Sequence, residues 1–230
     1  MEAVETWAVV VGAGDGQRLG SDLPKAFVGL GDQPLLAYSI ELFEGHPAVD
    51  GIVLAVPEGW EEPATLLADE LVAGKVAVAV TGGATRARSV AAALAAVPER
   101  AAVVLVHDAA RPLAGQELVD RVLGGLAEAD GAVPGVPLSD TVKQTQDGAV
   151  AATLDRAQLV AVQTPQAFHA EALRRAYARE GADLDAATDC AGLVEQAGGR
   201  VAVVAGERRN LKVTEPADLE LAEWWSARSS

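Results

Sequence analysis

The sequence predicts an α/β fold: a Rossmann-like, mostly parallel twisted sheet with helices on both faces. Short runs rich in valine, isoleucine and leucine alternate with alanine- and leucine-rich segments of helical length. Uninterrupted apolar runs are typical of strands buried on both faces, and their spacing suits right-handed crossovers between parallel strands. The 230 residues contain no linker and no internal repeat, so we expect a single domain over residues 1–230.

Strands and helices alternate along most of the chain. The apolar runs predict strands at residues 8–12, 51–56, 76–80, 103–106 and 201–205. Helices are expected at residues 35–43, 62–72, 86–97, about 170–179, about 186–196 and 216–225. Pro34 suits the start of the first helix, and Pro98 ends the third. Thr214 is expected to cap the N-terminus of the last helix.

A different pattern begins at Gly131 and predicts a protruding β-hairpin. Asp147 and Gly148 lie between the extended runs TVKQT and AVAATL, and Asp-Gly in this setting is a strong hairpin signal. The hairpin has few large apolar side chains, so it cannot bury enough apolar surface to be stable alone in water. We therefore expect an arm at about 138–160 that packs against another body, such as a second subunit.

Composition limits the partners. The formal charge of −15 argues against a nucleic-acid polymer, which needs an excess of basic residues, but it permits a small anionic substrate if the few cations gather in one cleft. Cys190 is the only cysteine, so no disulfide forms within the chain. The N-terminus lacks a basic signal region and no apolar run has membrane-spanning length, so we expect a cytoplasmic protein without a membrane partner.

The stretch at residues 7–28 predicts a phosphate-binding loop. Glycine occupies alternate positions from residue 12 to residue 16, directly after an expected strand, so the backbone can turn tightly and approach a ligand. Arg18 and Lys25 add the cations best suited to a polyphosphate. The glycine spacing fits neither a dinucleotide fingerprint nor a P-loop. The alternative interpretation is an ordinary strand-to-helix turn whose cations are solvated.

Further charged residues follow the other expected strands. Ligands of open α/β sheets bind beyond the carboxyl ends of the strands, which places Arg86, Asp108, Arg111 and Lys212 on one rim. Asp108 is suited to hold Mg²⁺, and Arg111 to hold a second anionic group. The alternatives are an ordinary helix N-cap for Asp108 and a surface ion pair for Arg111. His107 is expected to be a hydrogen-bonded core or turn residue. No nucleophile motif is present, which favours phosphoryl or nucleotidyl transfer, since that chemistry depends on positioning and charge neutralisation.

Several motifs together carry a family resemblance, and they span nearly the whole chain: GAGDGQRLGSDLPKAF, TGGATRARSV, VLVHDAARP, SDTVKQT, QTPQAF and NLKVTEPADLELAE. The sequence resembles the 2-C-methyl-D-erythritol 4-phosphate cytidylyltransferase family. The resemblance implies transfer of a cytidylyl group from CTP to that sugar-alcohol phosphate, giving a CDP-alcohol and pyrophosphate for isoprenoid precursor synthesis. It also implies Mg²⁺ or another divalent cation, and a homodimer whose arm reaches the neighbouring site. The alternative acceptor is another sugar-alcohol phosphate, such as ribitol 5-phosphate.

The resemblance further implies roles for individual positions. Those implied to be catalytic are Arg18, Lys25, Arg156 and Lys212. Those implied to bind the nucleotide are Gly12, Ala13, Gly14, Gly16, Gly83 and Ser89. Those implied to bind the acceptor are Asp108, Arg111, Thr141, Thr164 and Thr188, with Asp108 also associated with the metal. Ala84 departs from the family pattern, in which an acidic residue commonly follows the glycines.

Two other classes of function remain open to test. A nicotinamide-dependent oxidoreductase is disfavoured by the incomplete dinucleotide fingerprint and would bind NAD(P)H. A non-catalytic nucleotide-binding module would bind CTP without releasing pyrophosphate.

Overall fold

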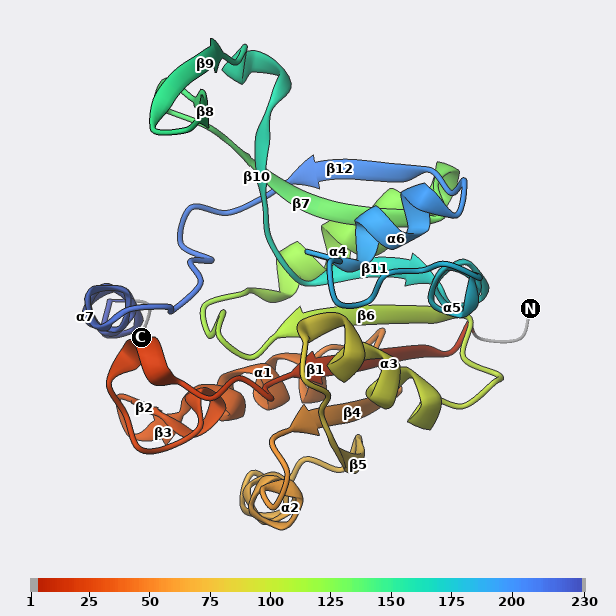
Figure 1. The fold of residues 1–230 in the computed structure, drawn as a ribbon. Coiled ribbons are helices and arrows are strands. Elements are labelled where there is room, and N and C mark those ends of the chain that lie inside the picture. The colour runs from red at the N-terminus through yellow and green to blue at the C-terminus, as the bar shows by residue number, and fades with distance from the viewer. Residues whose placement is uncertain (1–3, 229–230) are drawn as a thin grey trace.

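The computed structural model describes residues 4–228 and is built around one eight-stranded sheet (Figure 1). Its strands are β1 (Thr6–Val11), β4 (Gly51–Val56), β5 (Val76–Thr81), β6 (Val103–Asp108), β7 (Gly131–Pro137), β10 (Val160–Val162), β11 (Gln166–His169) and β12 (Val201–Ala205). Their spatial order is β10-β7-β11-β6-β1-β4-β5, and β12 also pairs with β7.

The sheet is mostly parallel, as the sequence predicted. β1 pairs in parallel with β4 and β6, β4 with β5, and β12 with β7. The exception in the centre is β11, which is antiparallel to both β6 and β7. No strand was expected there from the sequence, because Ala167 and Phe168 are the only apolar residues of β11. A run so short gives no periodic signal.

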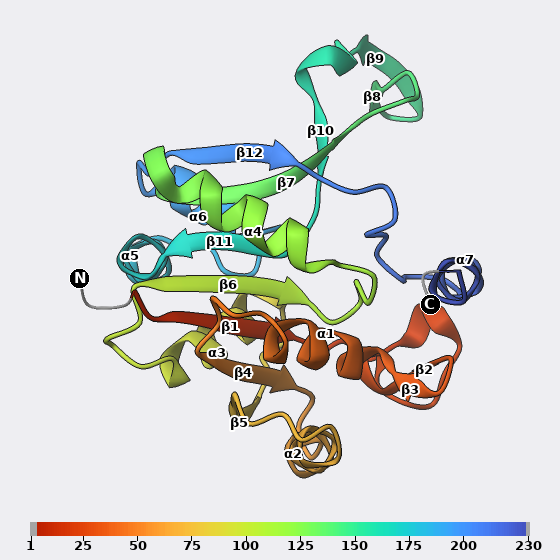
Figure 2. The same cartoon turned by 180° about the vertical axis from the view of Figure 1, so that it is seen from behind.

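Seven α-helices accompany the sheet within the described residues: α1 (Leu35–Glu44), α2 (Glu61–Glu70), α3 (Arg86–Ala96), α4 (Gln116–Gly124), α5 (Ala170–Ala178), α6 (Cys190–Gln196) and α7 (Pro216–Ser226). Helices α3, α5 and α6 cover the face toward the viewer in Figure 1, and α1 and α4 cover the opposite face in Figure 2. Over residues 4–228, no helix combines the length and the apolar character that crossing a bilayer would need.

The central apolar strands β1, β4 and β6 are buried on both faces because each contributes to two separate cores. In β1, Ala8 and Val10 belong to the cluster under α1, whereas Trp7 and Val9 belong to the cluster under α3. This alternation follows from the two-residue period of a strand. It explains why β1 is a continuous apolar run. Because β1 is packed on both faces, the position from which the following glycine loop begins is well defined.

Some helix boundaries differ from the expected ones. Helix α6 begins at Cys190 rather than near residue 186, because the Asp189 carboxylate accepts a hydrogen bond from the Gly192 amide at 2.9 Å and caps the helix there. The N-cap of α7 is Glu215 and not Thr214, so that prediction was wrong. Asp218 accepts from the Glu215 amide at 2.9 Å, which completes a capping box. Helix α4 was not expected at all.

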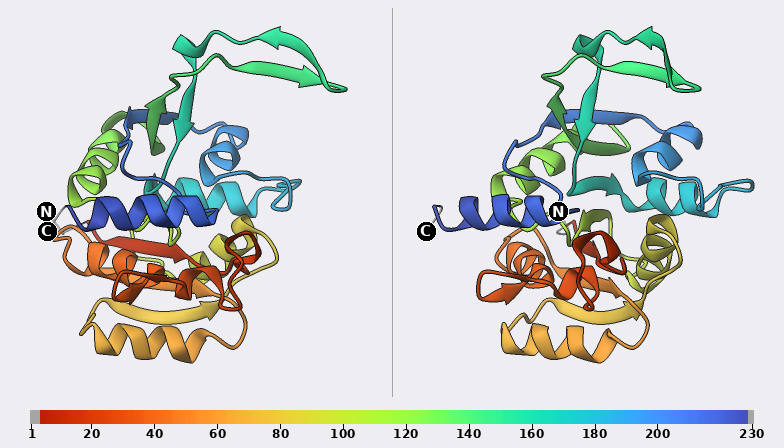
Figure 3. Two further views of the ribbon diagram at one scale, coloured as in Figure 1. Left: turned by 90° about the vertical axis from the view of Figure 1, so that its left-hand side faces the viewer. Right: turned by 60° about the vertical axis from the view of Figure 1, so that its left-hand side comes forward.

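The arm forms a β-hairpin of β8 (Lys143–Gln146) and β9 (Ala149–Thr153), as predicted. Asp147 and Gly148 both have positive φ, 51° and 78°, the backbone that a tight Asp-Gly hairpin turn requires. The arm leaves the sheet between β7 and β10 and projects beyond it (Figure 3). Every residue of β8 and β9 is exposed in the single chain.

Candidate active site

A cleft of about 540 Å³ opens at the edge of the sheet where β1 and β6 end. The parallel strands bring several predicted residues to this edge. Those that line the cleft are Gly12, Ala13, Gly14, Gly16, Arg18, Lys25, Gly83, Ser89, Asp108 and Lys212. The sequence therefore located the cleft correctly, from the rule that ligands of open α/β sheets bind beyond the carboxyl ends of strands.

The glycine loop begins tightly packed against the sheet. The Gly12 amide donates to the Ala55 carbonyl at 2.8 Å, so this amide is already paired inside the protein. A Cβ at position 12 would lie 2.9 Å from Cβ of Ala26. Gly12 therefore supports the loop by leaving space, and a phosphate would have to find its amide donors farther along the loop.

The second half of the loop returns Lys25 to the cleft. Gly16 has a φ of 73°, and a Cβ there would lie 2.9 Å from the Leu23 carbonyl oxygen. The Lys25 amide donates to the Gly14 carbonyl at 3.1 Å, which closes the loop on itself. Only glycine adopts such a backbone without strain. The loop thus places the Lys25 side chain beside the glycine backbone.

The turn before α3 forms another wall of the cleft. Gly82 packs directly against the glycine loop, because a Cβ there would lie 2.3 Å from Cβ of Ala13. The Ser89 hydroxyl accepts from the Gly83 amide at 3.1 Å and donates to the Thr85 carbonyl at 3.0 Å. Ser89 is buried, so in this structure it holds the shape of the turn.

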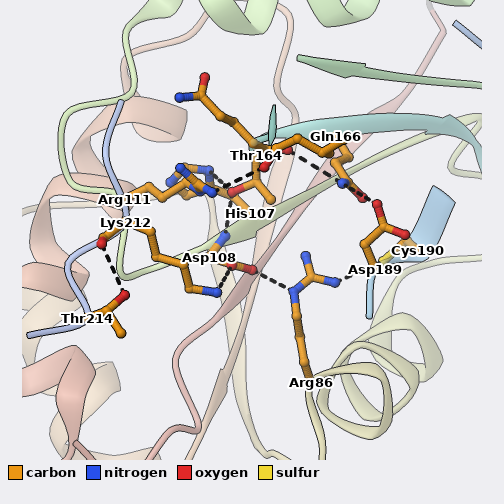
Figure 4. A network of polar contacts seen from close by, with 12 residues as sticks. Arg86, His107, Asp108, Arg111, Thr164, Gln166, Asp189, Cys190, Lys212 and Thr214 are labelled. Atoms are coloured by element: carbon orange, nitrogen blue, oxygen red, sulfur yellow. Dashed lines mark hydrogen bonds and ion pairs between the residues drawn. The ribbon is translucent and has the colours of Figure 1, made fainter. Parts of the chain in front are cut away.

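Asp108 stands between two cations on the cleft wall (Figure 4). Nε of Arg86 donates to its Oδ1, and Nζ of Lys212 donates to its Oδ2, each at 2.7 Å. The Asp108 amide donates to Oγ1 of Thr164 at 3.0 Å, which fixes the backbone behind the carboxylate. Burial alone would raise the pKa of Asp108, but the charges of Arg86 and Lys212 outweigh it and hold the pKa well below the usual range. The carboxylate is therefore ionised.

Positive charge gathers in this cleft although the whole chain is acidic. Burial, followed by the neighbouring charges of Lys212 and Arg18, lowers the pKa of Lys25 from 10.5 to about 8. Three cations that repel one another in a half-buried cleft favour a ligand with several negative charges. The arrangement suits a polyphosphate, as the sequence predicted from the residue types.

His107 has a structural position next to Asp108. Its Nδ1 lies 3.1 Å from Oγ1 of Thr164, and its ring packs edge-on against Phe43. Burial lowers the pKa of His107 to about 4, so the ring is neutral at physiological pH. This agrees with the core or turn role expected from the sequence.

Other predicted residues do not line the cleft of this chain. Two nitrogens of the Arg111 guanidinium donate to backbone carbonyls, Nη1 to Asn210 at 2.7 Å and Nη2 to Val162 at 3.4 Å. Thr188 is exposed in the segment before α6. Thr141 and Arg156 belong to the arm, where Arg156 donates to the Ser139 carbonyl.

Sequence reasoning placed Arg86 on the rim but assigned it no role, although its guanidinium is paired with Asp108. Asp15 and Thr214 also line the cleft, and neither was predicted to be a site residue. For Arg86 a signal was available: it is the first residue of α3 and lies shortly after the Gly82-Gly83 turn, where a side chain at the carboxyl edge of the sheet can reach the end of a neighbouring strand.

Comparisons with known proteins agree with this geometry. A family model described as "IspD: 2-C-methyl-D-erythritol 4-phosphate cytidylyltransferase" matches residues 6–228. The chain belongs to the 2-C-methyl-D-erythritol 4-phosphate cytidylyltransferase family. The resemblance drawn from the sequence motifs is thereby confirmed.

Similar proteins with this name occur in several bacteria. The 2-C-methyl-D-erythritol 4-phosphate cytidylyltransferase of Nocardia farcinica is 47% identical over 218 residues, which are 94% of this chain and 91% of that protein. The one from Streptomyces coelicolor is 45% identical and covers 97% of this chain and 85% of its own length. The crystal structure of the Thermus thermophilus enzyme superposes with a TM-score of 0.77 at 36% identity, covering 95% of this chain and 98% of that one.

The residues of the cleft fit a divalent cation that is shared with a substrate. Within residues 4–228 no group of three or more His, Cys, Asp or Glu side chains forms a site made of protein ligands alone. Mg²⁺, however, commonly takes one or two carboxylates and completes its shell with substrate phosphates and water. An ionised carboxylate accepts at about four positions. Arg86 and Lys212 each bond one oxygen of Asp108, so each oxygen keeps a further acceptor position.

Proposed function

We propose that this chain transfers the cytidylyl group of CTP to 2-C-methyl-D-erythritol 4-phosphate, releasing pyrophosphate, as a step of isoprenoid precursor synthesis. The observation that carries the proposal is the convergence of Arg18, Lys25 and Lys212 on one cleft beside a glycine loop, in a chain whose net charge is −15. Family membership supports the identity of the two substrates. Both are small, water-soluble anions, and we place the reaction in the cytoplasm.

The reaction is an in-line displacement at the α-phosphorus of CTP. An oxygen of the acceptor phosphate forms the new bond to this phosphorus, while the bond to the oxygen that bridges the α- and β-phosphorus breaks and pyrophosphate leaves with the electron pair. Arg18 and Lys25 neutralise the negative charge that grows on the α-phosphate oxygens and the leaving group. Lys212 orients the incoming phosphate. Mg²⁺, held by Asp108, would add charge neutralisation on the triphosphate.

We propose that two copies of the chain form a homodimer through the arm. The arm presents exposed apolar side chains, among them Val150, which is 60% exposed in the single chain, and Leu154. Arg156 and Thr141 lie on the arm, away from the cleft of their own chain. A two-fold arrangement would cover the apolar side chains and deliver Arg156 and Thr141 to the cleft of the second copy.

Pyrophosphate release tests the choice of both substrates. We expect release that requires Mg²⁺ and both substrates, with CTP strongly preferred over ATP, GTP and UTP. Glycine loops hold phosphates without reading the base, so equal turnover of all four nucleotides would remove the cytidylyl assignment and leave nucleotidyl transfer. Ribitol 5-phosphate is the alternative acceptor, and none of the relatives reported above carries its name. A higher kcat/KM with ribitol 5-phosphate would reassign the acceptor, and CTP binding without turnover would indicate a binding module.

The affinity for CTP should fall as the pH rises through about 8. Lys25 has a pKa of about 8 in the free protein, so its ammonium is present below this pH and is lost above it. A bound triphosphate favours the ammonium, and CTP binding should therefore take up a proton near this pH. Calorimetric titrations from about pH 6.5 to about pH 9.5 span this pKa and measure the effect. In Lys25→Arg the guanidinium stays charged and this pH dependence should vanish, so an unchanged profile in that variant would exclude Lys25 as its source.

A further inference from the structure

We propose that Arg86 is a positioning residue, which acts through Asp108 to set where the ammonium of Lys212 is presented to the substrates. The inference rests on the proposed function, because it assumes that Lys212 orients an incoming phosphate. Neither the family resemblance nor the sequence analysis gave Arg86 a role.

Lys212 has little local structure of its own to fix its side chain. It lies between β12 and α7 in a segment that is neither helix nor strand, and its side chain is 42% exposed. Its Nζ donates to Oδ2 of Asp108 at 2.7 Å. The place of the ammonium therefore depends on where the Asp108 carboxylate points.

Arg86 sets the direction of that carboxylate. It takes the other oxygen, Oδ1, at 2.7 Å, and both side chains are well buried, with exposures of 20% for Arg86 and 9% for Asp108. Figure 4 shows the carboxylate between the two cations, which approach it from different elements. An Arg pair in such surroundings has a fixed geometry, whereas an exposed pair has a variable one.

Arg86 is itself held in place by contacts that reach helices α5 and α6. Its Nη1 lies 3.5 Å from Sγ of Cys190, the first residue of α6, and the hydroxyl of Tyr177 on α5 lies 3.3 Å from the same sulfur. The guanidinium thus connects Asp108 to α6 and, through Cys190, to α5. Its position is determined by the packing of the fold, independent of any ligand.

One feature of Arg86 argues against a role in stability alone. Its Nη2 is buried and has no hydrogen-bond partner among the described residues. A buried donor without a partner lowers the stability of the folded state. If the Arg86–Asp108 pair only stabilised the fold, this unpaired nitrogen would reduce its contribution. A role in the site accounts for a guanidinium in this place.

The decisive experiment is a double-mutant cycle between Arg86→Met and Lys212→Ala, read as kcat/KM for the acceptor. Arg86→Met keeps much of the side-chain volume and releases the carboxylate, which can then draw the ammonium inward. We expect at least about a tenfold loss in an otherwise wild-type chain. In the Lys212→Ala background we expect a loss within about threefold, because the residue through which Arg86 acts is already gone. Arg86→Lys keeps a charge at this position and should recover part of the activity.

Arg88→Met is the matched control. Arg88 lies on the same helix and also pairs with an aspartate: its Nε and Nη2 donate to the two carboxylate oxygens of Asp185 at 2.6 and 2.8 Å. This pair is exposed and does not involve Asp108. Its loss should change kcat/KM by less than about twofold. The CTP dissociation constant and the midpoint of thermal unfolding are measured for every variant, so that a folding defect is seen separately.

Each outcome decides between the possibilities. An equal loss from Arg86→Met in both backgrounds would overturn the inference and assign Arg86 a general effect on the fold or the metal. A loss no greater than that of Arg88→Met would also overturn it. If Arg86→Met does not fold, the same comparison is made with Arg86→Lys. If the wild-type chain has no transferase activity, the proposed function itself is refuted. This result differs from the outcomes that overturn only the role of Arg86.

Discussion

Replacing Lys25 with methionine is expected to lower kcat by about a hundredfold or more while leaving the fold intact. The ammonium lies half-buried beside the glycine loop, where few waters compete with it for the charge that grows on the phosphates. A group that acts mainly in the transition state affects kcat and kcat/KM together. Steady-state pyrophosphate release with both substrates varied measures these constants.

The stability of the same variant provides the control. The pKa of Lys25 is lower in the folded protein than its ordinary value of 10.5, so below about pH 8 the folded state carries an ammonium that its surroundings disfavour. This cost is fully present below about pH 8 and fades as the pH rises toward 10.5. Lys25→Met should therefore unfold at the same temperature as the wild type or slightly higher at neutral pH. If Lys25→Met keeps a near-normal kcat, Lys25 is a solvated surface cation without a role in the reaction.

Mixing two inactive proteins is expected to restore activity if the arm crosses to a second copy. Lys25→Ala damages the cleft, and Arg156→Ala damages the arm that would reach the neighbouring cleft. After joint unfolding and refolding, random pairing makes about half of the molecules mixed dimers, each with one doubly damaged and one intact site. Activity should recover to roughly a quarter of the wild-type value for a closed dimer with independent sites.

The refolded mixture needs two controls. Native mass spectrometry must show the mixed dimers, and each single variant must be taken through the same refolding. A mixture with confirmed mixed dimers but no more activity than its components would rule out a shared site. Arg156 would then act, if at all, in the cleft of its own chain.

The elements that could be predicted are those whose signal is local. The apolar runs at 51–56 and 201–205 predicted the bounds of β4 and β12 correctly. Uninterrupted β-branched stretches of this length are typical of buried strands. The Asp-Gly turn likewise gave the hairpin of the arm. The antiparallel β11 could not be predicted, since Gln166 and His169 become strand residues only by pairing between β6 and β7.

The position of the cleft was also predictable from local patterns. The ion pairs inside it, which join Asp108 to Arg86 and Lys212, were not. The carboxyl-end rule brought the glycine loop and Asp108 together from sequence alone. That Asp108 would have both oxygens bonded by cations depends on where α3 starts relative to β6 and on how the segment after β12 returns. For Lys212 the partner lies 104 positions away along the chain. Local patterns do not encode such tertiary distances.

The central claim is that the cleft joins two substrates directly and uses no covalent intermediate on the enzyme. A ³¹P NMR time course of CTP, 2-C-methyl-D-erythritol 4-phosphate and Mg²⁺ with the enzyme tests it most directly. We predict that the CTP signals are replaced by those of pyrophosphate and a CDP-alcohol in equal amounts, and that CTP remains intact when the acceptor is left out. Release of pyrophosphate from CTP without the acceptor, or no reaction with both substrates present, would contradict the claim.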